Sequence, residues 1–210
     1  KNVVTNDSKT FKILLSSENK DLEDFIKNYF KKEKIKVKID YAGTLDIMDK
    51  INNKEDYDAI WASNSIWLYM LESTASVSNS KSTSIDPIVF GVKKEKAKQL
   101  GLVDKDIYTT DLLEKIKNKE LNFVMNSATR TNTGASAYLG FLTTLAGNPE
   151  VLTVDHLNDD KLKSDITSFL SGIERTSGSE EFLEELLLDN KYDAVVAYES
   201  SFINLNKTLV

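Results

Sequence analysis

The sequence predicts an α/β protein of two lobes, with mainly parallel sheets flanked by helices. Short apolar segments typical of strands alternate with segments whose apolar residues recur at helical spacing, throughout the 210 residues. Part of this order repeats, because Y-D-A-I-W-A-S-N-S at 57–65 resembles Y-D-A-V-V-A-Y-E-S at 192–200. Each lobe would then carry strands followed by polar loops and helix starts, the place where ligands bind in open α/β sheets.

In the first half, the strands are apolar or alternating segments, and the helices repeat apolar residues every three or four positions. Acidic residues in the first turn of the first helix suit its dipole, and Ser63–Ser65 caps the last helix. A serine-rich polar connector follows at 72–84. The predicted elements are a strand at 11–15, a helix at 22–30, a strand at 35–41, a helix at 45–51, a strand at 57–61 and a helix at 66–71.

The second half continues the alternation. Gly101 stops one helix, and Gly147 with Pro149 ends another as a glycine cap followed by a proline. The predicted elements are a strand at 88–92, helices at 93–100 and 111–118, a strand at 121–125, helices at 135–146, 161–170 and 180–188, a strand at 192–197 and a helix from 199 to 206.

Composition excludes several classes of function. The net charge of −6, with no stacking platform beside the lysines, argues against nucleic-acid binding. The absence of cysteine excludes disulfides, thiol catalysis and thiolate metal sites. No apolar run approaches the ~20 residues that a membrane-spanning helix needs. The chain opens at Lys1 without a methionine, which we interpret as a mature or trimmed form.

Only two of the 27 basic residues are arginines, and both lie in similar polar motifs. Arg130 belongs to S-A-T-R-T-N-T-G at 127–134, and Arg175 to R-T-S-G at 175–178. Arginine holds a carboxylate or oxyanion through two parallel hydrogen bonds, whereas lysine is a hydrated point charge. An arginine beside hydroxyls and glycine, just ahead of a helix, predicts a site for a small polar or anionic ligand. Arg175 also fits a surface salt bridge.

Polar loops that follow the strands present free backbone N–H groups at helix starts, which suits an anion or a carboxylate. Serine, threonine and asparagine are also the preferred helix caps, so each loop alone fits a simple cap. Trp67 fits either a cleft wall or the core. The predicted ligand-binding residues are Ser16, Ser17, Gly43, Thr44, Ser63, Asn64, Ser127, Thr129, Arg130, Asn132, Thr133, Arg175 and Tyr198.

Catalytic residues, a metal site and a cofactor are not predicted. His156 has no nearby serine or second histidine and is expected to lie exposed near a helix start. No nucleophile elbow, phosphate loop or zinc motif is present, and the acidic groups at 104–106 and 155–160 lack the spacing of a calcium loop. An enzymatic alternative would use Glu199 or Asp193 as a base, but it lacks a nucleophile or a metal.

Three segments carry a resemblance to a known family. They are N-F-V-M-N-S-A-T-R-T-N-T-G-A-S-A-Y from Asn122, L-S-G-I-E-R-T-S-G-S from Leu170, and Y-D-A-V-V-A-Y-E from Tyr192. Together they resemble the bacterial extracellular solute-binding proteins of the type 2 periplasmic-binding fold, of the kind fused to a von Willebrand factor A domain. The resemblance covers residues from about 11 to about 206, and the arginine segment is its most specific part.

The resemblance implies a two-lobed fold that closes on a ligand by a hinge. It implies lobe 1 at 11–88, lobe 2 at 89–198, and at 199–210 the incomplete start of a segment returning towards lobe 1, whereas the polar residues 1–10 are expected to form a frayed N-terminus. Distant relatives bind oxyanions such as molybdate or phosphate through hydroxyls and helix N-termini. Carried over, this role falls on the loops at 16–17, 63–64 and 127–134.

Two function classes remain. The first is a non-enzymatic, ABC-transporter-type solute-binding protein, extracellular and anchored at the surface of a bacterium as a lipoprotein or by another membrane tether. Its partners would be a small polar or anionic solute and a membrane permease or a fused von Willebrand factor A domain. The second is an interaction or scaffold module, fused or docked to a partner domain, whose ligand cleft is vestigial.

Overall fold

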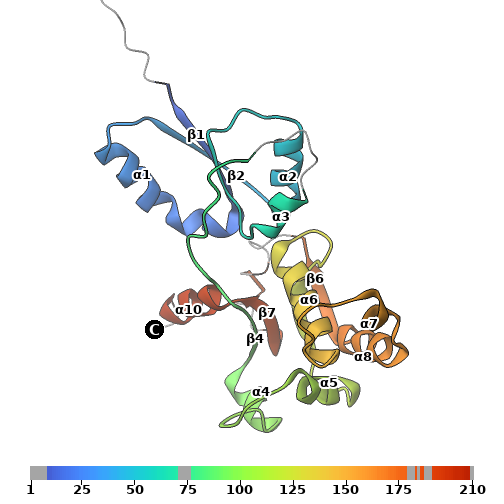
Figure 1. The fold of residues 1–210 in the computed structure, drawn as a ribbon. Coiled ribbons are helices and arrows are strands. Elements are labelled where there is room, and N and C mark those ends of the chain that lie inside the picture. Colours follow the sequence, from blue (N-terminus) through green and yellow to red (C-terminus); the bar gives the residue numbers. More distant parts are fainter. Residues whose placement is uncertain (1–8, 71–76, 179–182, 184, 187–190, 209–210) are drawn as a thin grey trace, which may run out of the picture. The chain divides into compact units, whose positions relative to one another are not determined.

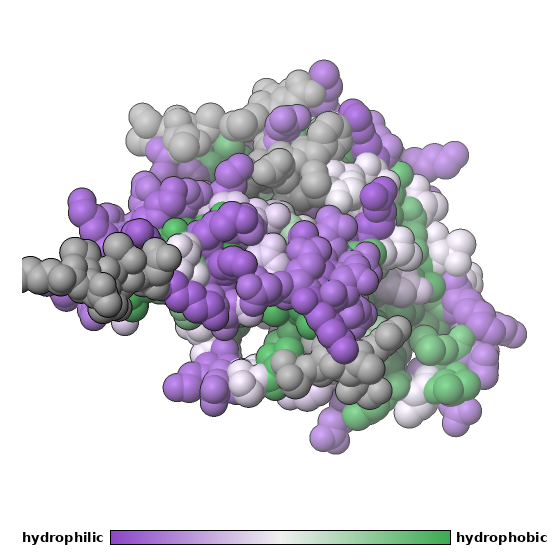
Figure 2. All heavy atoms as spheres, turned by 90° about the horizontal axis from the view of Figure 1, so that it is seen from above, coloured by the Kyte–Doolittle hydropathy of each residue, from purple (hydrophilic) through white to green (hydrophobic). Residues whose placement is uncertain are grey.

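The computed structural model describes residues 9–70, 77–178, 183, 185–186 and 191–208. The chain divides into two compact units, residues 1–83 and residues 84–210, and each is described by itself. Figure 1 shows strands and helices in both. The face drawn in Figure 2 is largely hydrophilic, with hydrophobic side chains visible between the polar ones. The sheets of the two units consist mainly of parallel strands and are flanked by helices, which confirms the predicted α/β fold.

The first unit is a three-stranded parallel sheet with strand order β2-β1-β3. Successive side chains of a strand point to opposite faces, so neighbouring residues of β1 enter two different cores. Ile13 and Leu15 pack with Ile26 of α1, whereas Leu14 packs with Ile47 of α2. The elements are β1 (Phe11–Ser16), a 3-10 helix η1 (Ser17–Leu22), α1 (Glu23–Lys32), β2 (Val37–Ala42), α2 (Thr44–Asn52), β3 (Ala59–Trp61) and α3 (Ile66–Tyr69).

The second unit is a four-stranded sheet with strand order β4-β7-β5-β6, in which β5, β6 and β7 are parallel and β4 is antiparallel to β7. The elements are β4 (Ile88–Val92), α4 (Lys94–Gln99), α5 (Thr109–Lys117), β5 (Phe123–Asn126), α6 (Asn132–Leu145), α7 (Val154–Asn158), α8 (Asp160–Leu170), β6 (Ile173–Ser177), β7 (Ala194–Tyr198) and α10 (Glu199–Thr208).

Aromatic rings fill one face of this sheet. Phe123 and Phe169 are fully buried, and Phe90 and Phe141 pack against them, with 4.4 Å between the ring centroids of Phe141 and Phe169. Burying each such side chain contributes about 1.5–3 kcal/mol. On the opposite face, Val124 and its cluster pack with Phe202 of α10. Helix α10 belongs to the second unit and packs against the sheet of this unit.

Three elements were not expected from the sequence, and the first is the 3-10 helix η1. β6 covers Ile173–Ser177, so the expectation that Arg175 stands in a loop before a helix is wrong. Its segment, I-E-R-T-S, is polar because β6 is an edge strand, and backbone pairing with the buried strand β5 makes it extended. α7 at Val154–Asn158 was also missed, since one short turn shows no apolar period.

Some expectations fall partly outside the described residues. The frayed start is described only at residues 9–10, and the connector only from residue 77, where it forms no helix or strand up to residue 87. Of the helix expected at 180–188, the described residues 183, 185 and 186 are helical. α6 begins at Asn132, three residues earlier than expected, because Thr131 caps it.

Candidate functional site

The loops predicted to bind ligand in the first unit share one edge of its sheet. Ser16 ends β1 opposite Ala42 of β2, and Leu15 lies opposite Trp61 of β3. Because the three strands are parallel, the loops after them leave from their carboxyl ends. These loops carry Ser16 and Ser17, Gly43 and Thr44, and Ser63 and Asn64.

Asn19 ties two of these loops together. Its Nδ2 donates to Ser16 Oγ at 3.0 Å and to the carbonyl oxygen of Trp61 at 3.2 Å. Ser16 is fully buried, so its hydroxyl needs such a partner. Asn64 has a local role, since its Oδ1 accepts a hydrogen bond from the backbone N–H of Ile66. Sequence reasoning missed Asn19, which lies in a polar stretch whose 3-10 geometry has no distinct signal.

The second unit gathers its predicted residues in the same way. Asn126 of β5 lies opposite Ser177 of β6, and Tyr198 ends β7, which runs parallel to β5. The backbone N–H of Ser127 donates to the carbonyl oxygen of Ser177 at 2.7 Å, so the pairing continues one residue into the loop. The loops after these three strands therefore start from one edge of the sheet.

The loop between β5 and α6 is held by its own hydroxyls. Thr131 Oγ1 donates to the carbonyl oxygen of Ser127 at 3.1 Å and accepts from the backbone N–H of Gly134 at 3.0 Å. Ser127 Oγ lies 3.2 Å from Thr129 Oγ1. Only glycine fits at 134, because a β-carbon there would clash with the carbonyl group of Ser127. The first turn of α6 is thus docked directly on the end of β5.

Arg130 brings the two arginine motifs together. Its guanidinium lies alongside Gly178, with Nη1 3.5 Å from the place that a β-carbon on Gly178 would occupy. The side chain of Arg130 is exposed, as an anion-binding group needs to be. Arg175 lies within β6 opposite Val124, two residues before the strand ends, so it does not belong to the loop cluster by its backbone position.

Asn132, Thr133 and Tyr198 lie beneath the surface. Asn132 Nδ2 donates to the hydroxyl of Tyr198 at 2.7 Å. The exposed fractions of the three residues are 3%, 0% and 7%. The hydrogen bond between Asn132 and Tyr198 joins the start of α6 to the end of β7, so these residues support the loop from below.

Buried polar side-chain atoms are normally hydrogen-bonded, and exceptions need an explanation. Among the described residues, only Ser63 Oγ and both amide atoms of Asn126 are buried without a hydrogen-bond partner. Each residue stands where a strand ends, Ser63 after β3 and Asn126 in β5. Sequence reasoning selected Ser63 and missed Asn126, which lies between the strand expected at 121–125 and the polar motif at 127–134.

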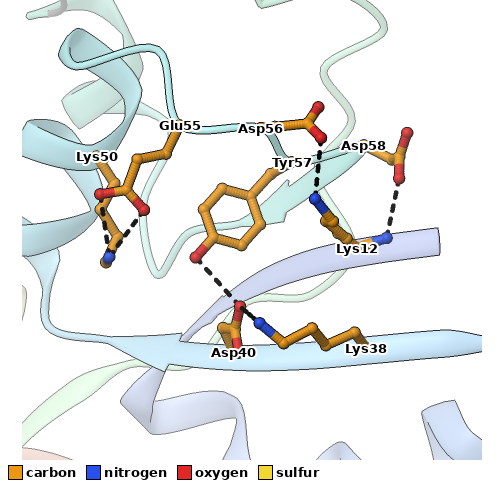
Figure 3. Close-up of polar contacts among 8 residues, drawn as sticks. All are labelled: Lys12, Lys38, Asp40, Lys50, Glu55, Asp56, Tyr57 and Asp58. Atoms are coloured by element: carbon orange, nitrogen blue, oxygen red, sulfur yellow. Dashed lines mark hydrogen bonds and ion pairs between the residues drawn. The ribbon is translucent and has the colours of Figure 1, made fainter. Parts of the chain in front are cut away.

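A hollow of about 240 Å³ lies elsewhere in the first unit, near the start of β1 and the segment before β3 (Figure 3). Its charges are paired: Lys12 Nζ lies 2.9 Å from Asp56 and Lys38 Nζ lies 3.0 Å from Asp40. The Asp56 carboxylate raises the pKa of Lys12, and burial, followed by Asp40, raises the pKa of Tyr57. These opposite charges neutralise one another, so the hollow is a poor site for a charged ligand.

Other polar groups have structural partners. His156 Nδ1 lies 2.8 Å from Thr153 Oγ1, so this half-buried histidine caps α7. Burial and a hydrogen bond to Glu23 raise the pKa of Tyr41 to about 12. Across the part of the chain that is described, no three His, Cys, Asp or Glu side chains gather as metal ligands would, and no helix is long and apolar enough to cross a membrane.

Two α/β units, each with polar loops at the carboxyl ends of parallel strands, define a protein of the type 2 periplasmic-binding fold. The sequence matches the family model of the bacterial extracellular solute-binding proteins over residues 14–209, and the chain belongs to this family. No curated protein matches it. Membership of this family confirms that the chain is a solute-binding protein. The fusion to a von Willebrand factor A domain remains a prediction.

Solved structures share this fold at low sequence identity. The sulfate-binding protein SubI from Mycobacterium tuberculosis H37Rv is 11% identical with a TM-score of 0.68, over 95% of this chain and 68% of that one. The periplasmic binding protein AfuA from Actinobacillus pleuropneumoniae, with fructose-6-phosphate bound, is 16% identical with a TM-score of 0.64, over 93% and 65%. Iron-bound HitA from Pseudomonas aeruginosa is 13% identical with a TM-score of 0.56, over 95% and 66%.

Proposed function

We propose that this solute-binding protein takes up a small polar or anionic solute, held by the loops at the carboxyl ends of the strands. Arg130 carries this proposal, because it is exposed beside Gly178 where the loops after β5 and β6 begin. Its guanidinium binds the negative group of the solute through paired hydrogen bonds. The hydroxyls of Ser127 and Thr129, which lie 3.2 Å apart in the loop that leads into α6, complete the anion-binding set.

The first unit contributes the hydroxyl loops after β1 and β3. Ser17 and Ser63 donate to the solute, and the bond from Asn19 holds Ser16 in place beneath them. The sulfate, fructose-6-phosphate and iron named for SubI, AfuA and HitA are bound by proteins of the same fold. They support a small solute with a strong charge, of which an oxyanion or a phosphorylated metabolite suits Arg130 best.

A thermal-shift screen tests this function. Sulfate, phosphate, molybdate, sugar phosphates, amino acids and polyamines are added one at a time, and a solute at about 100 times its Kd stabilises the protein by about 2.7 kcal/mol. We expect an anion to raise the Tm. A screen without any shift contradicts solute binding and favours the interaction module.

The anchor is tested with matched variants. Arg130→Ala is expected to abolish the shift, because the solute loses the paired hydrogen bonds of this guanidinium. Lys31→Ala removes an exposed positive charge from α1 and is expected to leave binding unchanged. A smaller thermal shift in Arg175→Ala than in the wild type would show that the second arginine also takes part in solute binding. Wild-type affinity in Arg130→Ala would disprove the assigned role.

The wider setting of the protein is also a proposal. We place it outside the membrane of a bacterium, anchored at the cell surface, where it passes its solute to a permease or works beside a fused von Willebrand factor A domain. Membership of an extracellular family supports this location. Protease treatment of intact cells is expected to degrade the protein, and full protection would rule out a surface position.

A further inference from the structure

The carboxamide of Asn126 is the most unusual buried group of the second unit. Asn126 is 0% exposed, and neither its Nδ2 nor its Oδ1 has a hydrogen-bond partner. The choice between amide oxygen and nitrogen does not affect this observation, because both atoms are unpartnered. A buried amide without partners destabilises a fold, and an apolar side chain of similar size would not.

The surroundings of Asn126 show no structural task for its side chain. Val124, two residues earlier on the same face of β5, packs in an apolar cluster. The strand pairing uses the backbone of Asn126 opposite Ser177, and the backbone of Ser127 continues it. The carboxamide is therefore a polar group that the fold retains without using it, one residue ahead of the loop that carries Arg130.

We propose that Asn126 is a specificity-determining residue for the solute, an inference that rests on the proposed function. An amide offers hydrogen-bond donors and an acceptor, so a group that satisfies both of its atoms must itself accept and donate. A hydroxyl or a protonated oxyanion does so, whereas a fully deprotonated oxyanion only accepts. Asn126 therefore selects a solute that carries an O–H group next to its negative charge.

Ser63 in the first unit has the same character. Its hydroxyl is buried without a partner, and like an amide it both donates and accepts. Both atoms of Asn126 are sealed from water, so a solute reaches them only when the neighbouring loop at 127–131 rearranges. Loop rearrangement of this kind is common in proteins that close around their ligands. Binding then supplies the hydrogen bonds that the free protein lacks.

Two probes of similar size and shape test the inference. At pH 6 inorganic phosphate carries at least one O–H group, whereas sulfate carries none. We expect titration calorimetry of the wild-type protein to give at least tenfold tighter binding of phosphate than of sulfate. Asn126→Leu is expected to remove this preference and, because the unpaired amide is gone, to raise the Tm of the free protein. Asn118→Leu, a change at an exposed asparagine of the same unit, is expected to leave the preference intact.

The other outcomes overturn the inference in distinguishable ways. Unchanged phosphate and sulfate affinities in Asn126→Leu refute the role of Asn126 alone, and a lowered Tm assigns it a structural role instead. If Asn126→Leu does not fold, Asn126→Asp replaces the donor by an oxygen at constant size and is expected to weaken both anions at least tenfold; wild-type affinity refutes the inference. If neither anion binds the wild-type protein and no other solute does, the proposed function fails as well.

Discussion

Single side chains at the strand ends have different tasks although their types are alike. Thr131 caps α6, which is the simple role that serine, threonine and asparagine often have, and Asn64 accepts a hydrogen bond from the backbone N–H of Ile66. Ser16 is tied down by Asn19. Arg130 is exposed over Gly178, and Ser63 and Asn126 have buried polar atoms that no protein group satisfies. Arg130, Ser63 and Asn126 are therefore the residues whose polar side-chain groups have no structural role in the described fold.

Asp165 gives a prediction on stability at the residue scale. Its carboxylate lies 2.8 Å from Lys117 Nζ and 2.6 Å from Lys161 Nζ, and these hydrogen bonds lower the pKa of Asp165. A lowered pKa in the folded protein stabilises it above the pKa of the unfolded chain, and this stability is lost as the pH falls through the folded value. Asp165→Asn is expected to cost about 1 kcal/mol at pH 7, because the two lysines are exposed.

Urea unfolding at pH 7 and at pH 3 checks this prediction. The variant and the wild type are expected to converge towards pH 3, since the wild-type carboxylate is then becoming protonated. A difference that is as large at pH 3 as at pH 7 would show that the ion pairs are not its cause. Asp160→Asn serves as the control, because the Asp160 carboxylate is fully exposed and lies 3.8 Å from Lys163 Nζ, too far for a hydrogen bond.

At the scale of elements, the contact between β5 and the first turn of α6 positions the anion-binding loop. Both ends of this contact are backbone: Gly134 of the helix lies against the carbonyl groups of Asn126 and Ser127. The loop between them has only five residues, 127–131, and its hydroxyls hydrogen-bond to its own backbone. The position of Arg130 therefore depends on how closely the helix approaches the strand.

Gly134→Ala tests this contact. The added methyl group meets backbone atoms that cannot move aside, so we expect a loss of stability of about 1–3 kcal/mol and weaker solute binding. Gly140→Ala lies in the same helix with no atom within 4 Å of the new β-carbon and is expected to stabilise by about 0.5–1 kcal/mol. Thermal unfolding compares the two variants, and equal effects would contradict the role given to Gly134.

For the molecule as a whole, the proposal assigns solute-binding loops to each of the two compact units. Each unit has its own core and its own edge of polar loops. The two tryptophans, Trp61 and Trp67, belong to the first unit, whereas Arg130 belongs to the second. The tryptophans can therefore report on an event that depends on an arginine outside their own unit.

Intrinsic fluorescence tests whether both units take part in binding. We expect a solute found in the thermal-shift screen to change the tryptophan emission, because binding alters the surroundings of the loop between Trp61 and Trp67. Arg130→Ala is expected to abolish this change at the same solute concentration. A fluorescence change that persists in Arg130→Ala would place the binding site within the first unit.

The alternation of strands and helices and the positions of the polar loops follow from the sequence alone. Apolar periodicity predicts β1, α1 and β5 because burial against a core imposes the period, and the hydroxyl-rich S-A-T-R-T-N-T-G motif marks the loop before α6. The formation of β6 by I-E-R-T-S depends on tertiary contacts, because pairing with a buried neighbour overrides a polar composition. The tertiary structure alone showed that Arg130 lies over Gly178 and that the amide of Asn126 is buried without partners, since contacts between distant segments leave no local pattern in a sequence.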